Sequence, residues 1–147
     1  MSEKVAIFPG SFDPFTIGHL SVVERASGLF DGIVIAIGIN DKKTSQNSVV
    51  ERMEQIRSAV SHIGNVRVAS YSGLTVDICR EYGAKYILRG VRSVTDFEYE
   101  QHIADINRRI SGIETVILFT LPEHSAVSSS IVRELQKYGY DTKEFLP

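Results

Sequence analysis

Five short apolar segments rich in β-branched residues recur along the chain and predict β-strands. They occupy residues 5–8, 33–37, 66–69, 86–88 and 115–119. Continuous apolar runs of this length are typical of strands that are covered on both faces, as in a parallel sheet. We therefore expect a sheet that lies inside the protein.

Helical spacing of apolar residues fills the segments between these strands. It is clearest at residues 22–29, 49–63, 74–82 and 99–110, and a last helix is expected from Ser128 onward. Strict alternation of strand and helix predicts right-handed crossovers and a doubly wound α/β fold around a five-stranded parallel sheet. Such folds bind ligands beyond the carboxyl ends of their strands, so functional residues should follow strands directly.

The whole chain, residues 1–147, is expected to form a single domain. No internal repeat, low-complexity tract or Pro/Gly/Ser linker interrupts the pattern. A chain of this length buries enough surface to fold without disulfides or a structural metal. The single cysteine, Cys79, cannot form an internal disulfide, and its place in an apolar helical pattern predicts an unreactive core thiol.

Charge and hydropathy narrow the classes of partner. The net charge is −2, so no overall basic field would hold DNA or RNA, and an anion must be bound locally. No apolar run approaches the roughly 20 residues that span a bilayer, and residues 1–10 lack the pattern of an export signal. We expect a cytoplasmic protein with neither nucleic acid nor membrane as a partner.

Two predicted helix starts carry their own capping groups. Ser48 with Glu51 and Thr95 with Glu98 have the spacing of capping boxes, and Asp96 adds an acid to the first turn of the second one. Such side chains satisfy the exposed amides and the partial positive charge of a helix start. These two ends are therefore expected to bind no further anion.

Two other predicted helix starts lack acids. The helix that begins near Thr16 has none before Glu24, and the helix that opens with serines at 128–130 has none before Glu134. Both follow predicted strands, so both are candidate phosphate sites. The serines could equally act only as an N-cap exposed to solvent, and the local pattern does not separate the two interpretations.

The turn after the first strand reads Gly-Ser-Phe-Asp-Pro at residues 10–14. Gly10 permits unusual backbone angles, so this turn would let the backbone approach a phosphate closely. Asp13 precedes a proline, which commonly starts a turn, and we assign Asp13 a structural role. No Walker A, G-x-G-x-x-G, H-E-x-x-H or C-x-x-C motif occurs, so kinase-like, dehydrogenase and zinc-hydrolase functions lose their usual support.

Motifs at both acid-free helix starts resemble those of nucleotidyltransferases. Thr-Ile-Gly-His at 16–19 is similar to the T-x-G-H motif, and Val-Ser-Ser-Ser-Ile-Val-Arg at 127–133 is similar to I-S-S-S/T-x-x-R. More specific matches resemble the phosphopantetheine adenylyltransferase family: Leu-Arg-Gly-Val-Arg at 88–92, Asp-Phe-Glu-Tyr-Glu at 96–100 and Asn-Arg at 107–108. The resemblance implies a Rossmann-like nucleotidyltransferase fold and transfer of AMP from ATP to 4′-phosphopantetheine, giving dephospho-coenzyme A and pyrophosphate in coenzyme A biosynthesis.

The family pattern implies a role for each matching residue. The catalytic residue that stabilises the transition state would be His19. The residues on the acceptor side would be Ser11, Lys42, Thr75 and Arg89. The residues on the ATP side would be Ser11, Phe12, His19, Gly90, Val91, Arg92, Glu100, His124, Ser125, Ala126, Val127, Ser128, Ser129 and Ser130. No direct metal ligand is implied, although the chemistry of ATP and the family both indicate Mg²⁺ as the cofactor.

Several basic residues that could bind phosphates could instead have only a structural role. Arg89 and Arg92 follow the fourth predicted strand, where two guanidiniums would suit paired recognition of phosphates, and surface salt bridges are the alternative. Arg133 is expected to support the triphosphate, with capping or a structural ion pair left open. Lys42 follows the second strand, at the edge where anions should bind, and would otherwise be an ordinary exposed loop lysine.

The expected reaction explains why the motifs contain donors and cations but no pair of acid–base residues. A phosphate monoester is already an anionic nucleophile near neutral pH, so catalysis reduces to positioning and charge stabilisation. Another nucleotidyltransferase and a noncatalytic nucleotide sensor are the rival functions. The match at residues 89–92 argues against another nucleotidyltransferase. The intact motif at residues 16–19 argues against a noncatalytic sensor. The resemblance also implies a homohexamer.

Overall fold

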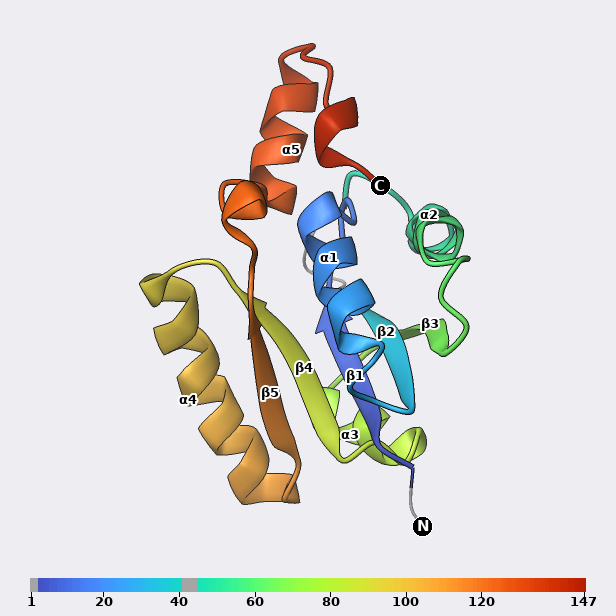
Figure 1. Cartoon of the computed structure of the whole chain (residues 1–147), viewed down its shortest axis with the longest axis vertical. Helices are drawn as coiled ribbons and strands as arrows, with labels where there is room; N and C mark the ends of the chain where they lie inside the picture. The colour runs from blue at the N-terminus through green and yellow to red at the C-terminus, as the bar shows by residue number, and fades with distance from the viewer. Residues whose placement is uncertain (1–2, 41–44) are drawn as a thin grey trace.

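The computed structural model describes residues 3–40 and 45–147, and a five-stranded sheet lies at its centre (Figure 1). The strands are β1 (Val5–Gly10), β2 (Gly32–Gly38), β3 (Val66–Tyr71), β4 (Tyr86–Val91) and β5 (Glu114–Phe119). Neighbouring strands pair in parallel, in the order β3-β2-β1-β4-β5. The predicted five-stranded parallel sheet is thus confirmed.

Helices connect and follow these strands. In the described ranges they are α1 (Ile17–Ala26), α2 (Val49–Ala59), α3 (Thr75–Glu81), α4 (Val94–Ser111) and α5 (Ser129–Lys137), with short 3₁₀ helices η1 (Pro122–His124) and η2 (Lys143–Phe145). Two of the predicted helical segments extend too far, because Leu29 lies beyond the end of α1 and Ile63 beyond the end of α2. Among the described residues, no helix has the length and apolar character that crossing a membrane requires.

Two apolar clusters enclose the sheet, one on each face. Val23 of α1 and Ile56 of α2 pack with Ile35 in one cluster, and Cys79 of α3 packs with Val34 in the other. Successive residues of β2 therefore face opposite layers, as expected for a strand buried on both sides. Burial raises the pKa of Cys79 to about 11, so the thiol stays protonated near neutral pH and the predicted core role is confirmed.

The strand order creates a place for a ligand between β1 and β4. The chain moves outward from β1 through β2 to β3, and then returns to β4 on the other side of β1 before reaching β5. Connections that leave β1 and β4 in opposite directions open a crevice at the carboxyl edge. Figure 1 shows α5 beyond this edge, while α4 runs alongside β4 and β5.

The helix starts agree with the sequence except at α4. Ser48 caps α2 by accepting a hydrogen bond from Glu51 N, as predicted. At α4 the cap is Ser93, which accepts from Asp96 N, so the predicted capping box of Thr95 and Glu98 is wrong. The extended backbone at Ser93 leaves Thr95 inside the helix. The first turns of α1 and α5 contain no acid, in agreement with the sequence.

One side of α4 stays exposed although its residues are apolar. Tyr99, Ile103, Ile106 and Ile110 lie at spacings of three and four residues, and their exposed fractions range from 39% to 64%. Spacing of this kind usually marks the face of a helix that packs on a core. The buried residue of α4 is instead Glu100. We call these four residues the α4 stripe.

Candidate active site

Two adjoining pockets open at the carboxyl edge of the sheet. The first, of about 550 Å³, lies between the starts of α1 and α5 and the end of β4. The second, of about 460 Å³, lies between the ends of β1 and β2, the start of α3 and the side of α4. The residues that line both pockets are Pro9, Gly10, Ser11, Arg89, Tyr99 and Glu100. Ligands in the two pockets would therefore meet at the ends of β1 and β4.

The turn after β1 packs tightly on itself. A Cβ at Gly10 would lie 2.8 Å from the Phe12 ring, so a larger residue there would displace the ring. Phe12 has a φ of 47°, in the left-handed region that bulky residues rarely adopt. Its buried ring meets the His19 ring edge-on, with 5.0 Å between ring centroids. Phe12 therefore supports His19 with its ring, and its backbone is the part available to phosphates.

The Asp13 carboxylate ties this turn to the segment that precedes α2. It accepts a hydrogen bond from Gln46 N at 2.8 Å and two from Asn47, from N at 3.1 Å and from Nδ2 at 2.9 Å. Asp13 is buried, so these bonds replace the water that its charge would otherwise require. The structural role predicted for Asp13 is confirmed.

Thr16 and His19 form a capping box at the start of α1, and this contact selects the tautomer of His19. Thr16 N donates to His19 Nδ1 at 3.0 Å, and His19 N donates to Thr16 Oγ1 at 3.4 Å. Because Nδ1 accepts, the hydrogen of the neutral ring lies on Nε2. The helix start predicted to be vacant is thus partly satisfied by its own side chains, although no acid occupies it.

The environment of His19 keeps its ring neutral. Its pKa falls from 6.5 to about 3, first because burial disfavours the charged form, and further because Arg89 and then Arg92 repel a second positive charge. His19 also lines the first pocket. Near neutral pH it therefore presents an unprotonated ring whose Nε2–H can donate a hydrogen bond.

The serines at the start of α5 have structural partners and also line the first pocket. Ser128 is the N-cap and accepts from Ile131 N, while Ser129 Oγ donates to the carbonyl of Pro14 at 2.7 Å. The first amides of a helix have no acceptor within the helix. The N-cap role that the sequence left open is therefore present, and the amides at this helix start remain suited to an anion.

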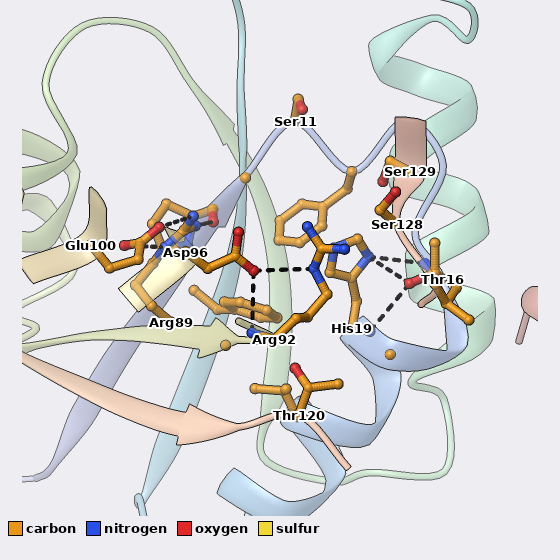
Figure 2. Close-up of a pocket in the computed structure, with 18 of the residues that line it drawn as sticks. Ser11, Thr16, His19, Arg89, Arg92, Asp96, Glu100, Thr120, Ser128 and Ser129 are labelled. Carbon is orange, nitrogen blue, oxygen red and sulfur yellow. Dashed lines mark hydrogen bonds and ion pairs between the residues drawn. The ribbon is translucent and has the colours of Figure 1, made fainter. Parts of the chain in front are cut away.

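Arg89 is held by Glu100 at the boundary between the pockets (Figure 2). Its Nε and NH2 donate to the two carboxylate oxygens at 2.9 and 2.7 Å, and its NH1 donates to the carbonyl of Pro9. Arg89 lies within β4, which pairs with β5 as far as Val91, so its predicted place after the strand is wrong. A bidentate pair with a buried carboxylate orients this guanidinium before any ligand arrives.

Arg92 follows β4 and pairs with an acid on the next helix. Its Nε lies 3.2 Å from Asp96 Oδ2, which also accepts from Arg92 N at the same distance. In the view of Figure 2 the Arg92 guanidinium overlaps the His19 ring, whose pKa its charge helps to lower. Both arginines thus form the ion pairs that the sequence left as the alternative, yet both also line the first pocket, so phosphate recognition stays a prediction for each.

Arg133 extends from α5 toward the turn after β1. Its NH1 donates to the Asp13 carbonyl at 2.6 Å, and its NH2 to Ser130 Oγ at 3.3 Å. Arg133 lines neither of the two pockets. A bracing role, which the sequence had left open as capping or ion pairing, fits these contacts better than support of the triphosphate.

Most residues that the sequence assigned to the site gather there. Those in the first pocket are Ser11, Phe12, His19, Arg89, Gly90, Arg92, Glu100, Val127, Ser128, Ser129 and Ser130. Those in the second are Ser11, Thr75, Arg89 and Glu100, of which only Thr75 does not also line the first. Those that line neither pocket are Val91, His124, Ser125 and Ala126. Lys42 lies outside the described residues.

Val91 ends β4 and its side chain is buried. His124 packs behind the start of α1, where its Cβ is 3.7 Å from the position that a Cβ on Gly18 would take. Its Nδ1 is buried without a hydrogen-bond partner in the described structure. Contact of these residues with a nucleotide remains a prediction.

Several lining residues were not assigned from the sequence. Thr120 directly follows β5, so the rule that functional residues follow strands would have found it. Tyr99 and Asn107 face the second pocket from α4 at a separation of two turns, a spacing that also fits a core face. Thr115 lies inside β5, and no local pattern marks it. Its Oγ1 is buried at the second pocket, and no residue in the described ranges is a hydrogen-bond partner for it.

No group of three or more His, Cys, Asp and Glu side chains that could hold a metal ion occurs among residues 3–40 and 45–147. The carboxylates of the first pocket, Asp96 and Glu100, are each paired with an arginine. These residues therefore do not form a cage for Mg²⁺, which usually takes one or two carboxylates together with substrate phosphates.

Comparison with known proteins connects this geometry to a family. A sequence model described as cytidylyltransferase-like matches residues 7–135. Phosphopantetheine adenylyltransferase of Bacteroides thetaiotaomicron is 53% identical over 144 residues, covering 98% of this chain and 95% of that protein. That of Porphyromonas gingivalis is 49% identical over 147 residues, covering 100% and 96%. The chain belongs to the phosphopantetheine adenylyltransferase family.

Solved structures support the fold of this phosphopantetheine adenylyltransferase family member. A putative nicotinate-nucleotide adenylyltransferase from Vibrio parahaemolyticus has a TM-score of 0.70 at 21% identity, covering 99% of this chain and 94% of that one. A bifunctional NMN adenylyltransferase/ADP ribose pyrophosphatase from Francisella tularensis has a TM-score of 0.73 at 17% identity, covering 99% and 45%. The predicted Rossmann-like nucleotidyltransferase fold is confirmed.

The state of the His19 ring can be measured directly. We expect ¹⁵N imidazole spectra of this phosphopantetheine adenylyltransferase family member to show His19 neutral, with hydrogen on Nε2, from pH 8 down to pH 5. The pKa is lower in the folded than in the unfolded protein, so the stabilising contribution of neutral His19 is present above about pH 6.5 and is lost as pH falls toward 3. Urea-denatured protein, in which His19 should titrate near its ordinary pKa, is the control. A protonated ring at pH 6, or hydrogen on Nδ1, would contradict this assignment.

Proposed function

We propose that this protein transfers AMP from ATP to 4′-phosphopantetheine, with release of pyrophosphate and formation of dephospho-coenzyme A. The observation that carries this function is 53% identity to a phosphopantetheine adenylyltransferase over 98% of the chain. The reaction is reversible and belongs late in coenzyme A biosynthesis. A cytoplasmic location suits the protonated, buried thiol of Cys79.

The two pockets divide the substrates between them. ATP occupies the first pocket, with its phosphates toward the starts of α1 and α5. Phosphopantetheine occupies the second, with its phosphate at the shared boundary near Ser11 and Arg89 and its arm toward Thr75 and α4. This arrangement brings the acceptor phosphate to the α-phosphate of ATP. Lys42 would add a cation on the acceptor side.

The catalytic step is one direct displacement. A phosphate oxygen of the acceptor attacks the α-phosphorus, a bond to it forms, and the bond from the α-phosphorus to the bridging oxygen of pyrophosphate breaks. Negative charge grows on the leaving pyrophosphate and on the oxygens of the reacting phosphorus. The Nε2–H of neutral His19 stabilises this charge as a preorganised donor, and no covalent enzyme intermediate is formed.

Oriented cations add to this stabilisation. Glu100 holds the Arg89 guanidinium in place, so little side-chain entropy is lost when a phosphate binds. Asp96 and Glu100 are already paired with arginines, so Mg²⁺ would be held mainly by the phosphates of ATP. When bound, it would supply charge neutralisation on those phosphates.

A homohexamer is the proposed assembly, by family resemblance. The α4 stripe supports association, since four exposed apolar side chains on one helix face mark a surface suited to burial against another protein. The stripe also borders the second pocket through Tyr99 and Ile103. Assembly would therefore cover the side of the acceptor pocket.

An acceptor assay tests the function. Purified protein is given Mg-ATP with 4′-phosphopantetheine, nicotinamide mononucleotide or glycerol phosphate, and pyrophosphate release is followed. Only 4′-phosphopantetheine should support rapid release. Equal turnover of another acceptor would indicate a different nucleotidyltransferase, and ATP binding without turnover of any acceptor would indicate a nucleotide sensor.

His19→Ala should bind ATP normally and lose on the order of 10²–10³ in kcat.

Thr115→Val tests the acceptor side of the site. The unpartnered hydroxyl of Thr115 should bind a polar group of the pantetheine arm, so its loss should raise KM for phosphopantetheine roughly threefold to tenfold, as expected for one neutral hydrogen bond. KM for ATP should not change, and the melting temperature should stay level because Val fills nearly the same volume. An unchanged KM for phosphopantetheine would exclude Thr115 from recognition.

Ile106→Glu tests the assembly. A charge in the middle of the α4 stripe should dissociate the oligomer, which light scattering after gel filtration would show as a smaller mass at micromolar concentration. Gln101→Glu places the same side chain on the opposite, exposed side of α4 and should leave the mass unchanged. An equal mass for both variants would show that the stripe is not the interface.

A further inference from the structure

Side chains from three other elements hold the carbonyls of the turn after β1. Donors on β4, α2 and α5 bond the carbonyls of Pro9, Ser11, Asp13 and Pro14, and these donors are Arg89, Arg52, Arg133 and Ser129 in that order. Three of these carbonyls belong to the turn and that of Pro9 to the end of β1, and bonds to three separate elements restrict how the turn can be oriented. The turn at residues 10–14 is therefore held as a rigid part of the site.

Arg52 is the most deeply buried of these donors. It lies on α2, its exposed fraction is 3%, and it lines neither pocket. Its NH1 donates to the Ser11 carbonyl at 2.6 Å and its Nε to the Ser48 carbonyl at 3.4 Å. Arginine is almost never fully buried without partners, because removing its charge from water is costly. An apolar residue at this position of α2 would avoid that cost. The reason for an arginine here should therefore lie in what its contact does for the turn.

The peptide group between Ser11 and Phe12 supplies that reason. A trans peptide is planar, so its N–H points opposite to its carbonyl. With the Ser11 carbonyl directed at Arg52, the Phe12 N–H is directed away from α2. Ser11 and Phe12 both line the first pocket, and the described structure records no acceptor for the Phe12 N–H. The left-handed φ of Phe12 shows that the turn adopts this conformation against local preference.

We propose that Arg52 is a positioning residue for phosphate binding: it holds the Ser11 carbonyl behind the turn, which aims the Phe12 amide at a phosphate group in the first pocket. The inference rests on the proposed function, because it takes the first pocket as the site of the nucleotide phosphates. Arg52 touches neither substrate. It acts through the peptide that follows Ser11.

A purely structural brace would make the same contacts, so the test measures anion binding separately from stability. The probes are inorganic pyrophosphate and adenosine, each titrated by calorimetry into the folded protein, with thermal melting recorded for every variant. Arg52→Met removes both hydrogen bonds and keeps most of the side-chain volume. Arg57→Met is the matched control, because Arg57 lies on the same helix, is exposed and carries the same charge.

Arg52→Met should weaken pyrophosphate binding about tenfold or more, the loss expected when one hydrogen bond to a charged group is misdirected. Adenosine affinity should stay within about twofold of the original, because it depends on no phosphate contact. Arg57→Met should change neither affinity. Arg52→Lys keeps one donor for the Ser11 carbonyl and should give a pyrophosphate affinity between those of Arg52→Met and the unaltered protein.

Equal pyrophosphate affinity in folded Arg52→Met and in the unaltered protein would overturn the proposal and leave Arg52 as a brace. If Arg52→Met does not fold, Arg52→Lys decides, and an unchanged pyrophosphate affinity in that variant would overturn the proposal. A parallel loss of adenosine affinity would do the same, since it would indicate general distortion. Failure of the unaltered protein to bind pyrophosphate would count against the proposed function, so the two failures are distinguishable.

Discussion

The Phe12 ring lies directly over Gly10, where a Cβ would stand 2.8 Å away, and on its other side it meets the edge of the His19 ring. This contact connects the end of β1 to the start of α1. Phe8 and Phe15 pack against the same ring, so His19 sits on an aromatic layer that excludes water from one side of it. Burial on this layer is the first cause of the low pKa of His19. The neutral state of His19, on which the proposed mechanism rests, therefore depends on the packing of one phenylalanine.

Charge in the site is arranged in advance of the substrates. Arg89 and Arg92 are each held by a carboxylate, Glu100 and Asp96, at hydrogen-bonding distance. A guanidinium that is paired with a carboxylate keeps its orientation. The two carboxylates also limit the repulsion between Arg89 and Arg92, which both lie near the His19 ring. Together with burial, which is the larger cause, the same cations keep His19 unprotonated. Ion pairs that look purely structural in isolation thus maintain the direction of the cations and contribute to the neutral state of His19.

Preorganisation extends from side chains to the backbone. Carbonyls at the end of β1 and in the turn after it are engaged by donors on β4, α2 and α5, so even α2, whose Arg52 lines neither pocket, helps to determine where the amides of the turn point. A loop held in this manner need not be ordered when a ligand binds, which lowers the entropic cost of binding. The unusual φ of Phe12 is the local cost of this arrangement.

By itself the sequence determined the five strands, their parallel arrangement, the two acid-free helix starts and the family, because these depend on local periodicity and on motifs within a few residues of each other. The family motifs also pointed to most of the residues that line the two pockets. Other features were beyond it. The cap of α4 at Ser93, the place of Arg89 within β4 and the exposure of the α4 stripe depend on where elements end and on what packs against them. The pairing of Arg89 with Glu100, the burial that lowers the pKa of His19 and the contact of Arg52 with Ser11 were decided only by tertiary structure. In each case the state of a side chain depends on a partner that the fold brings within 2.7 Å, or on the burial that the fold imposes, and neither can be read from local sequence.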